Sequence, residues 1–258
     1  MKKHIGRNII IILILLYLPC FQACKKGEPA DNPEKQLRDM VELAIGGDAE
    51  ANKKLNNLID LKLPGSSQYD NFIIESFKLK SGKRFYYLVL NYRNPVYNRF
   101  AIYDSAMTNY LIDKSLNGHI SVEVQDIEKS KFIRVVESFL SKDVLDVKRL
   151  SLYKADDKSA SLIFRNLISL STTDYTVSQD IIRQTADSVY THLSIPMRFG
   201  LSDTADVFVY DSIAKKFISQ HNTVDSIIRT ELQAFKRDSL ILPLITDKES
   251  ADKFTFSK

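Results

Sequence analysis

The chain has few of the residues that form common catalytic and metal-binding motifs. It contains two cysteines, four histidines, eight glycines and no tryptophan. The glycines do not form G-x-G-x-x-G or G-x-x-x-x-G-K, which excludes the usual phosphate-binding loops. No His-Glu-x-x-His motif occurs, and residues 64–67 (Pro-Gly-Ser-Ser) are not a nucleophile elbow. We therefore predict no catalytic residue, no metal and no cofactor, although enzymes whose sites are assembled by the fold stay open.

The amino terminus combines positive charge with a short apolar run. Lys2, Lys3 and Arg7 precede residues 9–18, which are ten apolar residues. A helix of ten residues is about 15 Å long, roughly half the hydrocarbon thickness of a bilayer. The run is too short for a permanent span and has the length of a cleavable export signal.

Two cysteines compete as the end point of this signal. Cys20 follows a proline, whereas Cys24 follows Ala23, and a signal peptidase favours a small residue at that position. Residues 18–24 resemble the lipobox of bacterial lipoproteins, although Phe21 stands where an aliphatic residue is commoner.

This resemblance covers about the first tenth of the chain and implies how the protein is processed. Residues 1–23 would be removed as a lipoprotein signal peptide, Cys24 would carry the acyl chains, and the polar residues 24–34 would form a tether. The implied partner is a lipid bilayer of the cell envelope. Lys25-Lys26 does not resemble the aspartate that retains lipoproteins at the inner membrane of enteric bacteria, which favours the outer membrane, on its periplasmic or surface face. A secreted protein with chance cysteines is the alternative.

Processing also changes the charge and the cysteine content. The chain carries 36 basic and 32 acidic side chains, a net charge of +4, and removal of Lys2, Lys3 and Arg7 lowers this to +1. That balance leaves no electrostatic footprint for nucleic acid. With Cys20 removed and Cys24 acylated, the mature domain has no disulfide and no thiol nucleophile, so a hydrophobic core must stabilise it.

Residues 35–61 show the spacing of two short helices. Apolar residues recur at helical intervals between Leu37 and Ile45, Gly46-Gly47 interrupts them, and Asp48 has the position of an N-cap. The turn resembles that of tetratricopeptide-like repeats, but one helical pair cannot form a solenoid. We expect a helical hairpin that packs on the rest of the domain.

From residue 70 to residue 195 the pattern changes to short strands. Residues 85–90 are apolar on both faces, which is typical of a central strand. Asn117-Gly118 indicates a turn, and apolar and polar residues alternate from Ile120 to Val124. The other candidate strands are residues 100–104, 109–113, 132–140, 144–153 and 160–170, with a turn at residues 155–158. Strands at this spacing predict an antiparallel sheet or sandwich.

Residues 196–245 are expected to add a β-hairpin and an amphipathic helix. The hairpin comprises residues 206–211 and 217–218, and the helix carries apolar residues from Val224 to Phe235, with Asn222 or Thr223 as its cap. Residues 102–111 and 209–218 share a Tyr-Asp-Ser pattern. A duplication or the turn preference of Asp and Ser explains it, and we favour the second. The fold class is mainly β with peripheral α-helices, α+β overall.

The candidate ligand-binding residues lie in a polar and aromatic loop. Eight aromatic residues occur between Phe85 and Tyr110, and sheet propensity accounts for most of them. The loop that contains Tyr92, Arg93, Tyr97 and Asn98 adds hydrogen-bonding groups to flat apolar side chains. If a binding surface exists, we expect it there.

The histidines and clustered carboxylates are candidates of lower rank. His119, His192 and His221 are assigned surface or capping roles; in one strand His119 and Glu123 would lie about 13 Å apart, too far for a dyad. Asp203, Asp206 and Asp211 cluster in sequence, and Asp104 and Asp113 bracket a hairpin. Such carboxylates could perform acid–base chemistry or bind calcium, but turn formation explains them as well.

Three classes of function remain. The first is a binding or assembly lipoprotein, with an envelope protein as a possible partner. The second is a hydrolase of envelope glycan or peptide, which two close carboxylates, one with a raised pKa, would support. The third is a structural surface lipoprotein, which one exposed apolar patch on a smooth surface would support. We rank the first class highest.

Overall fold

The computed structural model describes residues 32–61, 68–128, 130–141, 145–200, 204–238 and 240–246. Its two antiparallel sheets and few helices confirm the predicted mainly β fold with peripheral helices. The predicted export signal, Cys24 and Asp203 lie outside the described residues.

The first sheet has four strands in sequential order and is preceded by two helices. The helices are α2 (Pro33–Ile45) and α3 (Ala49–Leu58). The strands are β1 (Tyr69–Lys78), β2 (Arg84–Tyr92), β3 (Arg99–Asp104) and β4 (Asn109–Asp113), with the 3-10 turn η1 (Pro95–Tyr97) between β2 and β3.

The second sheet has eight strands, again in sequential order, and carries the remaining helices. Its strands are β5 (His119–Ile127), β6 (Ser130–Ser141), β7 (Leu145–Ala155), β8 (Ala160–Ser171), β9 (Thr176–Gln184), β10 (Ser188–Ser194), β11 (Ala205–Asp211) and β12 (Lys216–Ile218). The helices are α4 (Thr223–Leu232) and the short α5 (Leu242–Thr246), and the 3-10 turns are η2 (Met197–Phe199) and η3 (Gln233–Phe235).

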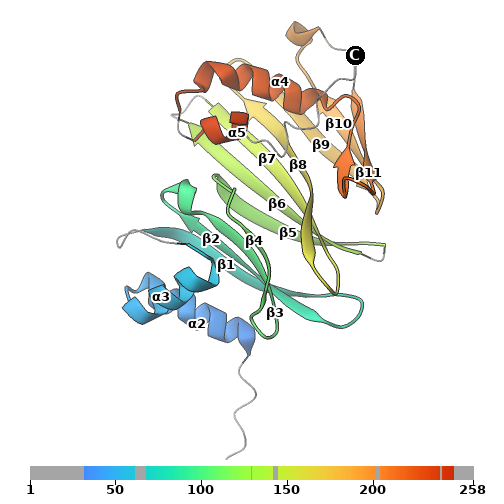
Figure 1. The fold of residues 1–258 in the computed structure, drawn as a ribbon. Helices are drawn as coiled ribbons and strands as arrows, with labels where there is room; N and C mark the ends of the chain where they lie inside the picture. Colours follow the sequence, from blue (N-terminus) through green and yellow to red (C-terminus); the bar gives the residue numbers. More distant parts are fainter. Residues whose placement is uncertain are drawn as a thin grey trace, which may run out of the picture.

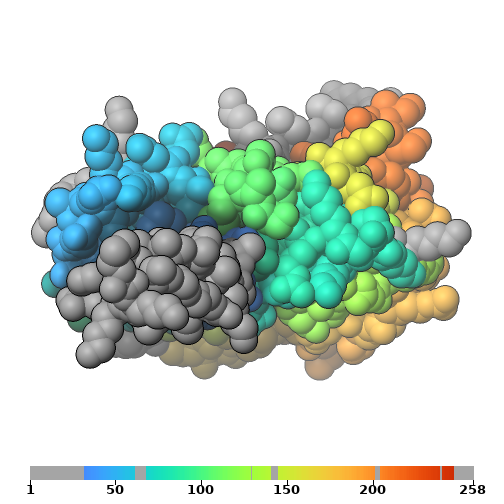
Figure 2. Space-filling model, turned by 90° about the horizontal axis from the view of Figure 1, so that it is seen from below, coloured from blue at the N-terminus to red at the C-terminus, as the bar shows by residue number. Residues whose placement is uncertain are grey.

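The elements form four layers, with a hydrophobic cluster between each pair of neighbours (Figure 1). Helices α2 and α3 cover the outer face of the first sheet, the two sheets face each other, and α4 and α5 cover the second sheet. Phe85, Phe100 and Tyr153 pack between the sheets. Figure 2 views the lower end of the molecule, with the helical pair in blue beside residues of the first sheet in teal and green.

The helical hairpin forms for the reasons that its sequence indicates. The carboxylate of Asp48 accepts a hydrogen bond from the Ala51 N–H at 2.7 Å and caps α3, while Gly47 takes a left-handed conformation with φ of 90°. Leu37 and Leu55 are fully buried against the first sheet. Strand β2 is buried on both faces, as its apolar sequence predicts.

The β region divides into two sheets after β4, and the predicted hairpin of β11 and β12 lies at the end of the second sheet. Asn117-Gly118 does not close a hairpin; it lies in the passage from the first sheet to the second. The backbone of Gly118 is not left-handed. A Cβ atom there would lie 2.9 Å from both the Glu137 Cβ and the Ser138 O atom, so close packing is what requires glycine.

The hairpins of residues 102–111 and 209–218 pair alike at Ile102–Leu111 and Val209–Ile218. Their registers then differ, because a shift in the first hairpin pairs Tyr103 with Asn109, whereas Tyr210 pairs with Phe217. In each hairpin the aspartate after the tyrosine, Asp104 or Asp211, accepts hydrogen bonds from N–H groups of the turn. Turn formation therefore accounts for the shared Tyr-Asp-Ser pattern.

Candidate functional site at the junction of the two sheets

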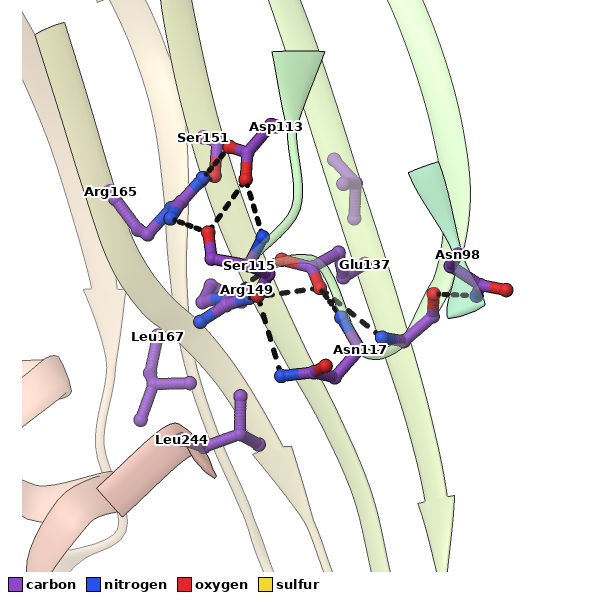
Figure 3. Close-up of polar contacts among 12 residues, drawn as sticks. Asn98, Asp113, Ser115, Asn117, Glu137, Arg149, Ser151, Arg165, Leu167 and Leu244 are labelled. Carbon is purple, nitrogen blue, oxygen red and sulfur yellow. Dashed lines mark hydrogen bonds and ion pairs between the residues drawn. The ribbon is translucent and has the colours of Figure 1, made fainter. Parts of the chain in front are cut away.

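A buried ion pair occupies the second sheet where the chain crosses from the first. The guanidinium of Arg149 in β7 donates two hydrogen bonds to the carboxylate of Glu137 in β6, at 2.6 and 2.9 Å, and the side chains are 2% and 0% exposed (Figure 3). Arg149 also donates to the Ser115 carbonyl at 2.7 Å. Glu137 accepts from the N–H groups of Asn117 (2.7 Å) and Gly118 (3.2 Å). The ion pair therefore holds the backbone of residues 114–118, the crossing segment that connects the first sheet to the second.

A second ion pair joins the end of β4 to β8. The carboxylate of Asp113 accepts hydrogen bonds from Arg165 and the Tyr153 hydroxyl, and Arg165 also donates to Ser115 at 2.5 Å and Ser151 at 2.8 Å. Burial alone would raise the pKa of Asp113. The charge of Arg165 and the hydrogen bonds from Ser115 and Tyr153 outweigh burial, so the pKa lies below its ordinary value. Asp113 is thus held as a carboxylate.

Two asparagine side chains on the side of the first sheet also bind the backbone at the junction of the two sheets. Asn98 donates to the Gly118 carbonyl at 2.5 Å and accepts from the Tyr92 N–H at 2.7 Å. Asn91 exchanges hydrogen bonds with the backbone of Ile120 at 2.8 and 3.0 Å. A side-chain amide carries both a donor and an acceptor. Each asparagine therefore supplies the hydrogen bonds that a neighbouring strand would supply, at the point where the two sheets separate.

A cleft of about 500 Å³ opens beside this junction. Tyr92, Arg93 and Asn98, three of the four predicted ligand-binding residues, line it. Tyr97 does not; its ring packs edge-on against Tyr92 at 6.3 Å, in the cluster beneath α2 and α3. The other lining residues come from the ends of both sheets and from the C-terminal segment: Asp70, Pro95, Asn117, Gly118, His119, Ser138, Phe139, Leu140 and Leu240.

The cleft combines charged groups with exposed apolar surface. Arg93 is exposed, and His119 lies 3.8 Å from the Asp70 carboxylate and 3.3 Å from the Asn71 amide. Leu140 is 73% exposed. Tyr92 is buried, and burial raises the pKa of its phenol far above the ordinary value. The cleft can thus bind a group with both charge and apolar area, with Arg93 as its exposed permanent cation.

The remaining candidates lie elsewhere. His192 and His221 are exposed, as expected for surface histidines, and His192 contacts the Thr204 carbonyl at 2.9 Å. Asp206 is buried within β11 and does not form a turn, so the turn role predicted for it is wrong. Among the described residues, no three His, Cys, Asp or Glu side chains are grouped so as to hold a metal ion.

Sequence reasoning missed the two ion pairs and the role of the crossing segment. In the sequence, Asp113 is recognisable only as a residue that brackets a hairpin, and no motif marks Glu137, Arg149 or Arg165. The usable signal was charge within predicted strands, since Arg149 and Arg165 lie in the apolar runs of β7 and β8. A buried charge in a central strand needs a charged partner.

The comparisons with known proteins provide no family for this chain: no protein-family model matches it, and no curated protein is similar to it. None of the helices in the described part of the chain is long and apolar enough to cross a bilayer.

Proposed function

We propose that the protein is a lipid-anchored lipoprotein of the cell envelope that binds a ligand or an envelope partner in the junction cleft. The lipobox-like residues 18–24 support the anchor, with Cys24 as the acylated residue. Lys25-Lys26 supports the outer membrane as its location. These are inferences from the signal region alone.

The observation that carries the binding role is the rigid construction of the cleft. Its wall at Asn117 and Gly118 is fixed by Glu137, and Asn98 connects that wall to the backbone of Tyr92. Because these contacts hold the backbone next to Arg93 and His119 before binding, the cleft wall itself loses little ordering entropy on binding. A rigid cleft of mixed polarity suits recognition of a specific molecule.

The hydrolase alternative gains no specific support. It requires two close carboxylates, one with a raised pKa. The two carboxylates at the junction, Asp113 and Glu137, are each paired with an arginine, and the pKa of Asp113 is lowered. The alternative therefore stays a prediction from sequence.

The experiment is a comparison of three affinity-tagged proteins solubilised gently from membranes: the wild type, Arg93→Glu and Lys53→Glu. The two variants make the same charge change at exposed positions, but only Arg93 lines the cleft. We expect a near-stoichiometric protein or small molecule with the wild type and Lys53→Glu, reduced at least tenfold with Arg93→Glu. Equal recovery from all three, or recovery of none, would contradict binding in the cleft.

A further inference from the structure

The eight-stranded sheet ends in an incomplete edge that is distinct from the junction cleft. Strand β11 covers residues 205–211, but β12 pairs only with residues 209–211, beginning at the pair Val209–Ile218. No described strand lies beside residues 205–208 on that side. An open strand edge presents backbone donors and acceptors to other chains.

The direction of the backbone groups follows from the pairing with β10. The Tyr210 N–H donates to the Asp187 carbonyl, on the β10 side, at 2.9 Å. Backbone groups of successive residues point to opposite sides of a strand. Those of Ala205 and Val207 therefore point toward the open edge.

The side chain of Asp206 accepts one of the hydrogen bonds that a neighbouring strand would accept at this edge. The Oδ1 atom of Asp206 accepts from the Val207 N–H at 2.8 Å and from the Ser219 hydroxyl at 2.5 Å. Its Oδ2 atom is buried and has no hydrogen-bond partner among the described residues. Asp206 is only 4% exposed, and a half-satisfied buried carboxylate favours an added donor of positive charge.

A groove of about 790 Å³ runs along the same edge. Val207, Val209 and Ile213 line it and are 40%, 55% and 94% exposed, and Asp206 and Asp211 add two carboxylates. Among the described residues that line it, none is a lysine or arginine. The groove therefore complements an apolar segment that carries positive charge.

We propose that this edge binds an extended segment of a partner protein, which pairs with the backbone of Val207 in line with β12. The apolar side chains of the segment cover Val207 and Val209. A backbone carbonyl of the segment accepts the hydrogen bond from the Val207 N–H in place of the Asp206 carboxylate. The displaced carboxylate then pairs with a lysine or arginine of the segment. The edge lies on the opposite side of the molecule from α2, where the chain enters the fold (Figure 1). A protein anchored at its amino terminus thus presents the edge away from the tether. This inference goes beyond the proposed cleft function and does not depend on it.

The test uses the Cys24→Ser protein and three peptides. The first is acetyl-Gly-Thr-Val-Lys-Val-Thr-Gly-amide, the second replaces its lysine by norleucine, and the third is N-methylated at both valines. Binding is followed through amide chemical shifts in NMR spectra of the labelled protein. We expect the first peptide to shift the amides of residues 205–209 and 216–221. The norleucine and N-methylated peptides should bind at least tenfold more weakly, since one lacks the charge and the other the backbone donors.

Variants separate pairing at the edge from general apolar binding. Val207→Lys places a charge on the edge and should weaken the first peptide at least tenfold, while Ile45→Lys adds the same charge at an exposed position of α2 and should not. Arg93→Glu should leave peptide binding unchanged, which distinguishes this proposal from the cleft function. Equal binding of all three peptides, or shifts confined to other residues, would overturn it.

Two other occupants are outcomes of the same test. If the protein forms a dimer that Val207→Lys dissociates, a second copy of the chain occupies the edge and the partner proposal is wrong. If the first peptide binds only to a variant that ends at Thr246, residues 247–258 of the chain itself occupy the edge, and the proposal is again wrong.

Discussion

At the scale of single residues, Gly118 has less room for a Cβ atom than the other described glycines. A Cβ atom would approach the Glu137 Cβ and the Ser138 O atom at 2.9 Å, and neither atom can rotate away. Gly118→Ala should therefore lower the free energy of unfolding by about 1–3 kcal/mol, as overpacking does. Urea denaturation measures this. Gly46→Ala, where the nearest atom lies at 3.4 Å, is the control and should stay within about 0.5 kcal/mol of the wild type.

The lowered pKa of Asp113 makes a second residue-scale prediction about pH. A carboxylate with a lowered pKa in the folded state stabilises the fold above its unfolded pKa of about 3.9, and this stabilisation is lost as the pH falls toward the folded pKa. Asp113→Asn leaves Arg165 without its buried partner and should cost about 3–5 kcal/mol at pH 7. The gap between wild type and variant should narrow below about pH 4. A gap of constant size from pH 7 to pH 2 would contradict the ion-pair account, and the exposed Asp39→Asn controls for the lost charge.

At the scale of elements, a buried carboxylate adds to the apolar contacts that attach α4 to the second sheet. Asp225 is fully buried, accepts a hydrogen bond from the Leu167 N–H at 2.8 Å and pairs with Arg229 at 2.7 Å, while Arg229 donates to the Leu244 carbonyl of α5 at 2.5 Å. Asp225→Ala should cost about 3–5 kcal/mol, because it removes the carboxylate that pairs with the partly buried Arg229 and leaves the buried Leu167 N–H without its acceptor. Hydrogen exchange should show α4 and α5 losing protection first. Uniform loss across both sheets would contradict this local attachment.

Elements also explain how much of the fold the sequence could predict. Local patterns predict β2, the helical hairpin and the β11–β12 hairpin, because each depends on residues near one another in the chain. The division into two sheets depends on contacts such as Asn98 with Gly118, twenty residues apart, and no local pattern encodes them. The same reason separates Tyr97 from the cleft: a 3-10 turn at Pro95–Tyr97 directs it toward Tyr92, which the loop's composition does not reveal.

At the scale of the whole molecule, the proposed lipid anchor would influence which surfaces the protein can present. The described structure begins at Asn32, so residues 24–31 would separate the lipid from α2 by at most about 30 Å. The helical pair would then lie closer to the tether than β11, which lies in the other half of the molecule (Figure 1). Cleft and edge would then face different neighbours.

This arrangement requires Cys24 to be the lipidated residue, which two serine substitutions test. Cys24→Ser should abolish palmitate labelling and release the protein from membranes, because acyl chains supply most of the membrane affinity. Cys20→Ser should leave labelling and membrane association unchanged, since that residue would be removed with the signal. Labelling lost in Cys20→Ser alone would place the cleavage site at Cys20 and lengthen the tether by four residues, to at most about 40 Å. Labelling retained in both variants would show that neither cysteine carries the lipid. The position of the β11 edge relative to a membrane could then not be inferred from a lipid anchor.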